Sequence, residues 1–582
     1  MDIAAWVFIV LCAVLAAVHR GWLCALLRRT EDPRTLGLFR VAAGGLLLAW
    51  TLDLVPLADY LFSGDGLVSG ASARARFGRG VRWSWLYGSD SPKTVRIYLA
   101  LMGASCTALT LGLGTRVAKW TTLLLLQGLV SRNAVYLGGE QVLSSFLFYL
   151  CLSKCGEAYS VDRWLAARRG AVGLTAIPAW PRLLMILQLV PMFFANGLAK
   201  SGAMWRDGDV FYYLINHPHF ARAEMWGVSA IAGTNLFRAM TWAAHVFELT
   251  FPLAVLGVFV RINSTLAWPE LGSRGRRLAI VLPPLIGANI VVLAALRWPP
   301  DTPVHLPLAT CLLGGAAIGL APLGILRRLP RRWIDVALGR GPWVTVWVAL
   351  AAQLFFALRI GWFTGLTLCA AILFFDGAAI GRAMAKLRLR PLETEPNRPP
   401  MTRGRGLAVL AICALHTVAV SSAILPRNRP AAHWRSTLER PLKRWLEWTT
   451  GAQTWRMFAP NGARAVTDLE VVMVDGQGRE HSVGAGLVDA KMIDSPWSLI
   501  KRHKIRRRIS GRNGARFRAE HARWACREFG GALHGEVTVV VYGTRMVMPP
   551  PAALAADRAA ALAQYDRSLR REPLYESACA SL

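Results

Sequence analysis

Long apolar runs recur along the whole chain, and polar or basic stretches separate them. A run of about 18–20 apolar residues is long enough to cross the hydrocarbon core of a bilayer as a helix. The candidate spans lie near residues 4–20, 38–57, 95–113, 118–134, 140–153, 183–199, 236–258, 278–297, 306–325, 343–358, 362–380 and 406–425. Because some of these runs are short, we expect about nine to twelve transmembrane helices. The pattern predicts an all-α polytopic membrane protein.

Lysine and arginine concentrate in alternate connections between these spans. The basic connections lie around residues 28–34, 116–119, 154–182, 261–277, 327–332 and 381–406. With the spans given above, all of them fall on one side of the membrane, and the positive-inside rule makes that side cytoplasmic. The opposite side then holds residues 59–94, 131–140, about 200–235 and the tail after 426. The tail is therefore expected to be extracytoplasmic.

The pattern changes after residue 426, where the long apolar runs stop. Residues 466–483 and 534–549 alternate apolar and polar positions around turn residues, which predicts strands. Residues 435–449 have the spacing of an amphipathic helix that lies against the membrane. The basic run at 501–518 is interpreted as a solvated or lipid-facing charged surface, with a site for a polyanion or an acidic peptide as the alternative. The tail thus predicts a small extramembrane domain that contains β-strands.

The composition agrees with a membrane protein. Hydrophobic residues make up 54% of the 582 residues, and the formal net charge is +32. In a soluble protein such a charge would point to nucleic acid. In a membrane protein the simpler explanation is that lysine and arginine set the topology and contact anionic lipid. We therefore expect membrane lipids, and no nucleic acid, as partners.

The cysteines do not have the spacing of a metal site. Most of the 10 cysteines fall in or beside apolar runs. Cys151 and Cys155 stand close together but lack the second pair of ligands that a zinc site needs. We therefore expect no metal. Cys526 and Cys579 lie in the polar tail and could form a disulfide if the tail faces an oxidising compartment.

One stretch combines an apolar helix with ionisable chemistry. VPMFFANGLAKSGAMWRDGDVFYYL, residues 190–214, begins as a membrane helix, and Lys200 stands where the apolar run stops, close to Trp205. An ammonium group at the mouth of a membrane helix loses part of its hydration, which favours the neutral amine. A neutral amine can act as a general base. The alternative is a lysine that reaches the headgroups and anchors the end of the helix.

A second pair of ionisable residues lies inside a predicted span. His245 and Glu248 are one helical turn apart in HVFEL, so they share a helix face within 236–258. Ionisable side chains are costly inside a membrane, so these two should pair with another group or line a cavity. They could form a proton relay or a structural interhelical pair, and the sequence leaves both open.

Several of these stretches together resemble a known membrane module. The stretch around Lys200, residues 28–53 (RRTEDPRTLGLFRVAAGGLLLAWTLD), residues 113–165, HVFELTFPL (245–253) and TWRMFAP (454–460) carry the resemblance. They are similar to the horizontally transferred transmembrane (HTTM) domain of vitamin K-dependent gamma-carboxylases and their bacterial relatives. The resemblance implies a protein of the bacterial inner membrane.

The resemblance also divides the chain. It implies an extra N-terminal membrane helix at 1–27, an HTTM core at 28–261, an inserted helical pair at 262–343, the end of the core at 344–380, a basic cytoplasmic linker at 381–405, a transmembrane helix at 406–425 and a periplasmic α+β domain at 426–582.

The family's chemistry maps onto the residues around Lys200. In the carboxylases a lysine in the pattern G-x-x-K-x-x-x-x-W is the proposed base that deprotonates vitamin K hydroquinone, and Gly197, Lys200 and Trp205 match that pattern. Oxygen converts the quinol anion to a stronger base, which removes a γ-hydrogen from a peptidyl glutamate, and carbon dioxide adds to the carbanion. The resemblance implies reduced vitamin K or menaquinol with O2 and CO2, a glutamate-containing peptide or protein as substrate, and no metal. Trp205 and Trp455 would contact the quinol, although Trp455 could instead pack at the domain junction.

One position departs from the family pattern. The carboxylases place a functional histidine directly after an asparagine, whereas here Asn133 is followed by Ala134. A proton-handling partner is therefore missing at this position, and His245 or His217 would have to replace it. Asn133 and Tyr136 would contact the quinol ring or hydrogen-bond the backbone where the helix breaks. The competing hypothesis is a non-carboxylating protein that binds lipid or quinone, or that assists assembly.

Overall fold

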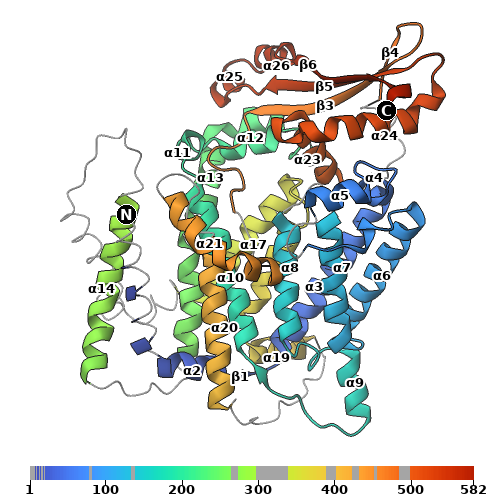
Figure 1. Ribbon diagram of the computed structural model, residues 1–582. Helices are drawn as coiled ribbons and strands as arrows, with labels where there is room; N and C mark the ends of the chain where they lie inside the picture. Colours follow the sequence, from blue (N-terminus) through green and yellow to red (C-terminus); the bar gives the residue numbers. More distant parts are fainter. Residues whose placement is uncertain are drawn as a thin grey trace.

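The computed structural model describes residues 20–77, 82–132, 138–223, 225–263, 273–295, 338–387, 402–421, 431–450, 455–483 and 498–582, and isolated positions between 7 and 18. These residues form a bundle of long helices, with a smaller domain that contains a β-sheet at one end of the bundle (Figure 1). Asn133, Ala134 and Tyr136 lie outside the described residues, as do the predicted span at 306–325 and most of that at 4–20.

The bundle is almost entirely α-helical because a helix satisfies its backbone hydrogen bonds internally. Its helices are α2 Arg20–Arg28, α3 Arg34–Leu54, α4 Ala58–Phe62, α5 Gly70–Phe77, α6 Pro92–Leu111, α7 Thr115–Arg132, α8 Gly138–Leu152, α9 Val161–Arg168, α10 Trp180–Ala199, α11 Ala203–Asp207, α12 Val210–Asn216, α13 Trp226–Asn263, α14 Ser273–Ala295, α17 Arg340–Ala357, α18 Phe363–Ala371, α19 Gly377–Lys386, α20 Arg403–Ser421 and α21 Ala431–Trp448. Strands β1 Thr30–Glu31 and β2 Ile177–Pro178 pair at the end of the bundle away from the β-sheet.

Five helical segments among the described residues are long and apolar enough to cross a membrane. They are Arg34–Phe62, Pro92–Leu111, Trp180–Ala199, Asn235–Phe259 and Gly404–Ser421. A mostly α-helical chain compatible with membrane insertion is therefore confirmed. Among the described residues, α8, in the predicted span at 140–153, has 15 residues, which is shorter than a full crossing needs.

The predicted span at 362–380 is broken into two helices. The helical segments Phe363–Phe374 and Gly377–Lys386 are bent by 105° relative to each other. Phe375 leaves the helical conformation, and Asp376 starts the next helix by accepting a hydrogen bond from the backbone N–H of Ala379 at 2.7 Å. An N-cap aspartate of this kind begins a new helix rather than continuing the old one.

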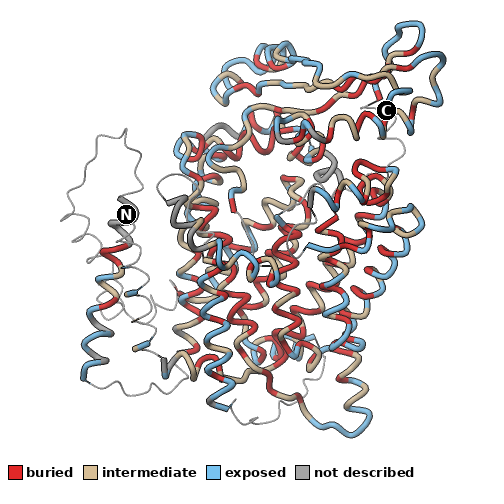
Figure 2. Tube along the Cα trace, viewed as in Figure 1, coloured by how far each residue is buried: buried red, intermediate tan, exposed pale blue. Residues whose placement is uncertain are grey.

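An aromatic cluster packs α10 against α13 and α17 in the middle of the bundle. The ring of Phe193 in α10 lies 4.4 Å, centroid to centroid, from that of Phe251 in α13 and 5.4 Å from that of Trp347 in α17. These side chains belong to the buried interior that runs through the bundle (Figure 2). The packing holds α10 beside α13.

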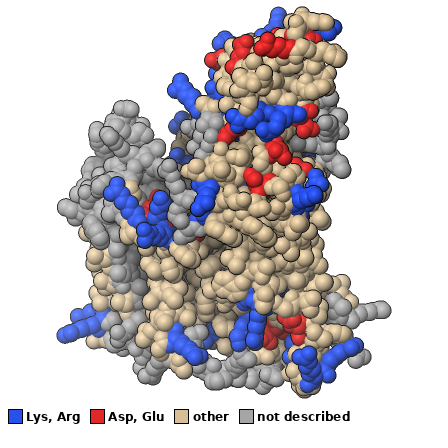
Figure 3. All heavy atoms as spheres, turned by 45° about the vertical axis from the view of Figure 1, so that its right-hand side comes forward, with Lys and Arg blue, Asp and Glu red and all other residues tan. Residues whose placement is uncertain are grey.

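The described basic residues of the predicted cytoplasmic connections lie at the end of the bundle away from the β-sheet. Arg182 of the connection at 154–182 pairs with Glu31 of β1 at 2.9 Å. Arg340, the first residue of α17, pairs with Asp376, the N-cap of α19, at 2.6 Å. On the face shown in Figure 3, charged side chains gather near this end and towards the β-containing domain, and the described surface between them consists mainly of other residue types. The described parts of these connections thus share one end, and its assignment to the cytoplasm remains a prediction.

The C-terminal domain is built on a four-stranded antiparallel sheet of order β4-β3-β5-β6. Its strands are β3 Ala465–Val474, β4 Glu480–Ser482, β5 Thr538–Val547 and β6 Arg570–Ala578. The first three confirm the predicted strands at 466–483 and 534–549. The sequence did not predict β6, because this edge strand contains Pro573 and is largely exposed, so it lacks an alternating apolar pattern.

Four helices pack on or beside this sheet. Helices α23 Ser498–Ser510 and α24 Arg518–Phe529 lie between the sheet and the bundle (Figure 1). Helix α25 Pro551–Ala556 contacts α13 of the bundle, and α26 Arg558–Arg567 contacts β5 and places the ring of Tyr565 5.8 Å from that of Trp226 in α13. The predicted amphipathic helix at 435–449 is α21, which packs on α20.

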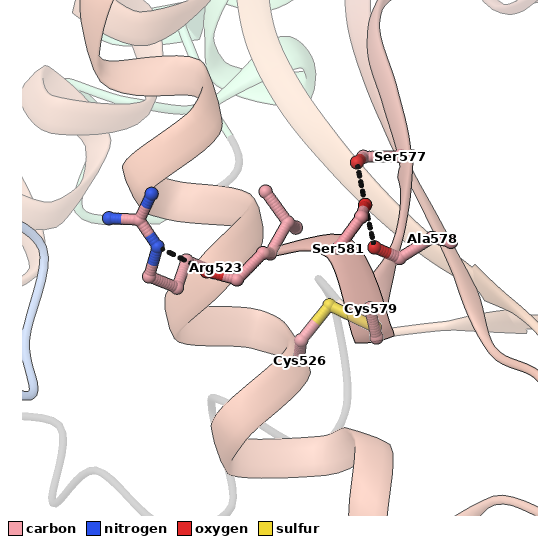
Figure 4. The surroundings of a disulfide bond; sticks show 7 residues. Arg523, Cys526, Ser577, Ala578, Cys579 and Ser581 are labelled. Atoms are coloured by element: carbon pink, nitrogen blue, oxygen red, sulfur yellow. Dashed lines mark hydrogen bonds between the residues drawn. A yellow bond between two sulfur atoms is a disulfide. The ribbon is translucent and has the colours of Figure 1, made fainter.

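A disulfide closes the C-terminal domain. Cys526 of α24 and Cys579, directly after β6, form a bond with an S–S distance of 2.07 Å (Figure 4). The pairing that the sequence offered as one option is the pairing found. It joins α24 to the end of the edge strand.

Candidate functional site

Lys200 lies at the C-terminal end of α10, on the side of the bundle that faces the β-containing domain. The helix ends at Ala199, and the backbone N–H of Lys200 still donates to the carbonyl oxygen of Gly197 at 3.1 Å. The Lys200 side chain is 4% exposed. It is therefore enclosed by protein, unlike the anchoring lysine that was the alternative expectation.

Glu248 of α13 is the direct partner of Lys200. Nζ of Lys200 donates to Oε2 of Glu248 at 2.5 Å, and Nδ2 of Asn196 donates to Oε1 of the same carboxylate at 2.9 Å. The Lys200 ammonium also lies 4.2 Å from the ring centroid of Trp205, where the negative face of the indole attracts a cation. The carboxylate and the ring together offset the loss of hydration. The interhelical pair expected as one role of Glu248 is thus present.

Gly197 allows α10 and α13 to approach each other closely at this point. A Cβ on Gly197 would lie 3.1 Å from Cδ2 of Leu249 and 3.2 Å from Cβ of Glu248. The carbonyl oxygen of Gly197 accepts a hydrogen bond from Nε2 of His245 at 3.0 Å, so Nε2 carries the proton. The His245 ring lies 5.5 Å from that of Trp205. His245 therefore stands beside the ion pair and orients the end of α10.

We call Lys200, Glu248, Asn196, His245 and Trp205 the Lys200 group. The sequence predicted four of its members, and the structure brings those four together. The sequence analysis did not predict Asn196. The available signal was a polar amide in the otherwise apolar stretch 189–199, one turn before the lysine.

The junction segment, Trp455–Asn461, binds the Lys200 group through its backbone. The backbone N–H of Met457 donates to Oδ1 of Asn196 at 2.7 Å, and Nε1 of Trp205 donates to the carbonyl oxygen of Phe458 at 2.8 Å. Both polar groups of the Asn196 amide are therefore hydrogen-bonded: Nδ2 to Glu248 and Oδ1 to the junction segment. The segment that carries the TWRMFAP motif is thus attached directly to the end of α10.

Gly202 strengthens this attachment. Its backbone N–H donates to the carbonyl oxygen of Pro460 at 3.0 Å, and the N–H of Met204 donates to Oδ1 of Asn461 at 3.1 Å. A Cβ on Gly202 would overlap the side chain of Asn461. Only a residue without a side chain fits this approach.

The junction segment also lines a cavity of about 490 Å³ between the bundle and the C-terminal domain. Trp455 lines this cavity and lies 6.5 Å, centroid to centroid, from Phe363, so it is both a junction residue and a wall residue. The aromatic lining consists of Trp50, Phe220, Trp362, Phe363, Trp455 and Phe458. The junction segment therefore contributes to the cavity and to the Lys200 group.

The basic run at 501–518 adds cationic side chains to the lining of the cavity. Ile505 of α23 is buried in the core of the C-terminal domain, whereas His503, Lys504 and Arg507 line the cavity. Lys504 and Arg507 are exposed, as the prediction of a solvated charged surface requires, and they also face the cavity. An aromatic wall and a basic wall suit a ligand that has an apolar ring or an anionic group.

His217, one of the two histidines considered as replacements for the family histidine, lies elsewhere. Its ring is buried 5.1 Å from that of His219 and 4.8 Å from that of Phe220. Burial lowers the pKa of His217 to about 3, so it is neutral at physiological pH. His245 is thus the histidine placed beside Lys200.

The Lys200 group holds an amine and a carboxylate in direct contact, inside the protein and next to an aromatic face. Such a pair can pass a proton between its members and to a third group. Comparison of the chain with protein-family models, with curated proteins and with solved structures finds no match.

Proposed function

We propose that the chain is an integral protein of the bacterial inner membrane, with its C-terminal domain in the periplasm. The five long apolar helices support insertion, and the bent pair adds a sixth if it counts as one span. The basic residues at the far end of the bundle support a cytoplasmic location for that end. The disulfide between Cys526 and Cys579 supports an oxidising compartment for the C-terminal domain.

We further propose that it is an HTTM-family enzyme that deprotonates a quinol, resembling the vitamin K-dependent gamma-carboxylases. The observation that carries this proposal is the buried contact of 2.5 Å between Nζ of Lys200 and Oε2 of Glu248. A carboxylate at this distance can receive the ammonium proton, which leaves the neutral amine that a general base requires. The motif resemblance and the geometry therefore select the same lysine.

The neighbours of Lys200 have separate roles in this proposal. Glu248 takes the proton from the ammonium, and the free amine of Lys200 then accepts the hydroxyl proton of the quinol. Asn196 holds Oε1 of the carboxylate, so that Oε2 stays directed at Nζ. With its proton on Nε2, His245 presents Nδ1 as a further acceptor. In this role His245 replaces the family histidine, whose position is occupied by Ala134 in this chain.

The cavity offers surfaces that suit the proposed substrates. Its described lining does not include Lys200 or Trp205, and the junction segment links the cavity to the Lys200 group. Its volume of about 490 Å³ is within the usual range for small-molecule sites. Trp50, Trp362 and Trp455 can pack against the ring of reduced vitamin K or menaquinol. Lys504 and Arg507 can attract the carboxylate of a glutamate-containing peptide. Oxygen and carbon dioxide complete the set of substrates.

A second candidate function has its own supporting observation. Asn196 and Trp205 both bind the backbone of the junction segment, so the Lys200 group also fastens the C-terminal domain to the bundle. In a protein that binds quinone or lipid, or assists assembly, the ion pair would be part of this attachment. Ala134, in place of the family histidine, favours this second candidate.

The test is a turnover assay on the purified full-length chain. The protein is incubated with reduced vitamin K or menaquinol, bicarbonate, oxygen and a glutamate peptide, and quinone epoxide is measured. Lys200→Met should reduce epoxide formation by about 10²–10⁴-fold, as expected for loss of a general base. The matched control is Lys93→Met, because Lys93 is an exposed lysine at the start of α6. It should keep full activity.

The two candidates give different results. Epoxide formation that depends on Lys200 supports the enzyme. If no quinol yields epoxide while quinone binds tightly, the enzymatic proposal is wrong and the binding function is favoured. Equal loss of activity in both lysine variants would contradict a specific role for Lys200.

A further inference from the structure

His219, Asp468 and His503 come together at the junction of the two parts of the molecule. His219 follows α12 of the bundle, Asp468 belongs to β3, and His503 belongs to α23. Their potential ligand atoms all lie within 4.8 Å of one another. Three distant segments of the chain thus supply two imidazoles and one carboxylate to one point.

The distances in this cluster approach those of a metal site. Nε2 of His219 lies 3.4 Å from Oδ2 of Asp468, and ligand atoms around a tetrahedral zinc ion with bonds near 2.0–2.1 Å lie roughly 3.3 Å apart. The rings of His219 and His503 are stacked, with centroids 4.5 Å apart and planes inclined by 18°. Because an imidazole nitrogen binds a metal in the plane of its own ring, one of the two rings would have to turn before both could reach one ion.

Neighbouring groups hold one oxygen of the Asp468 carboxylate, Oδ1, in place. Oδ1 lies 2.9 Å from Nε of Arg506 in an ion pair and accepts a hydrogen bond from the backbone N–H of Leu469 at 2.8 Å, while Oδ2 faces His219. Metal-binding carboxylates are usually fixed by such outer partners. Arg506 thus orients the carboxylate and leaves Oδ2 for another ligand.

The cluster opens towards the cavity. His219 and His503 are both part of its lining, next to Lys504 and Arg507. A metal ion on three protein ligands would have its fourth position on this side, as zinc does in catalytic sites. The two cationic side chains would favour an anionic group, such as a carboxylate, at that position.

We propose that His219, Asp468 and His503 bind a divalent transition-metal ion of the zinc class, whose open position faces the cavity. This site revises the expectation of no metal, which rested on the spacing of cysteines. Histidine and aspartate from three separate segments have no local spacing, so the sequence could not indicate them. The proposal does not depend on the enzymatic function, because its test measures metal binding alone.

The test uses the full-length chain in detergent, stripped of metal with a chelator. Zinc chloride and cobalt chloride are the probes, and bound metal, the visible spectrum of cobalt and the melting temperature are measured. We expect about one equivalent of zinc, a tetrahedral cobalt spectrum and a rise in melting temperature. Asp468→Asn and His503→Ala should abolish all three, and Arg506→Gln should weaken binding by about 10–100-fold.

The matched control is His481→Ala. His481 is another histidine of the same domain, paired with Asp475 at 2.9 Å, and it should bind zinc as the unaltered chain does. A variant whose metal-free melting temperature equals that of the metal-free parent is folded, so its loss of binding supports the site. Failure of the stripped parent to bind zinc overturns the proposal. So does zinc binding that persists in the folded variants, because it would belong to other surface groups.

Discussion

The Lys200→Met substitution leaves the carboxylate of Glu248 inside the protein without its ammonium partner. The two side chains are 4% and 12% exposed, so water can do little to stabilise the remaining charge. Removing one partner of a buried pair costs about 3–5 kcal/mol. Asn196 still donates to Oε1 at 2.9 Å, which places our expectation at the lower end, at about 3 kcal/mol.

Glu248→Gln should cost a similar amount, because it leaves the ammonium of Lys200 without a carboxylate. The double variant contains two neutral side chains of nearly the same volume as the original pair. It should lose no more stability than either single variant, which corresponds to a coupling energy of about 3 kcal/mol. The coupling energy is favourable because each single substitution leaves one buried charge without its partner, whereas the double substitution leaves none.

The assay is denaturation of the four proteins in one detergent, followed by tryptophan fluorescence. The control cycle uses Arg96 and Asp59, which also form a contact of 2.8 Å but are 67% and 47% exposed. This exposed pair should show a coupling below about 1 kcal/mol. Additive effects of Lys200→Met and Glu248→Gln would refute the inference that the two groups are charged and coupled. The double variant should also remain inactive in the epoxide assay, because it lacks the amine.

Three further predictions concern other parts of the molecule. Gly202→Ala should lower the melting temperature of the full chain, because the new Cβ would overlap the side chain of Asn461. Burial lowers the pKa of His521 from 6.5 to about 3, so below pH 6.5 the unfolded chain binds a proton that the native chain does not. Acidification from pH 7.5 to 5.5 should therefore remove about 1.4 kcal/mol of stability through His521 alone, and His521→Gln should reduce the pH dependence of stability by that amount. Cys526→Ser should destabilise the C-terminal domain by up to about 4 kcal/mol in the chain-entropy account, since the bond to Cys579 closes a sequence separation of 53 residues; denaturation with and without reductant checks this.

The part of the fold that follows from local periodicity could be predicted from the sequence. Apolar runs gave the helices of the bundle, and alternation gave β3 and β5. The break between α18 and α19 was missed because the apolar run continues up to the capping residue Asp376. Strand β6 was missed because an edge strand need not alternate. In both cases the structure depends on hydrogen bonds, from the backbone N–H of Ala379 to Asp376 and between β5 and β6. A hydropathy pattern carries no information about such hydrogen bonds.

The candidate site was predictable to the extent that its residues are close in sequence or belong to a motif. Lys200 and Trp205 lie in one stretch, and Glu248 was noted because a charge within an apolar span needs a partner. The identity of that partner depends on the packing of α10 against α13, which no spacing encodes. His219 and Asp468 were not predicted for the same reason, since their proximity exists only after the C-terminal domain has docked on the bundle.

The junction segment connects the features on which the proposals depend. Its backbone at Met457 holds the Asn196 amide, and that amide positions the carboxylate of Glu248. The same segment lines the cavity, so a ligand that fills the cavity contacts the element that orients the ion pair. A ligand that binds the docked state preferentially stabilises the geometry around Lys200, and disruption of that geometry weakens binding of the ligand by the same free energy. Quinol affinity should therefore fall in Asn196→Ala even though Asn196 does not line the cavity, which distinguishes linkage through the junction segment from direct contact with the ligand.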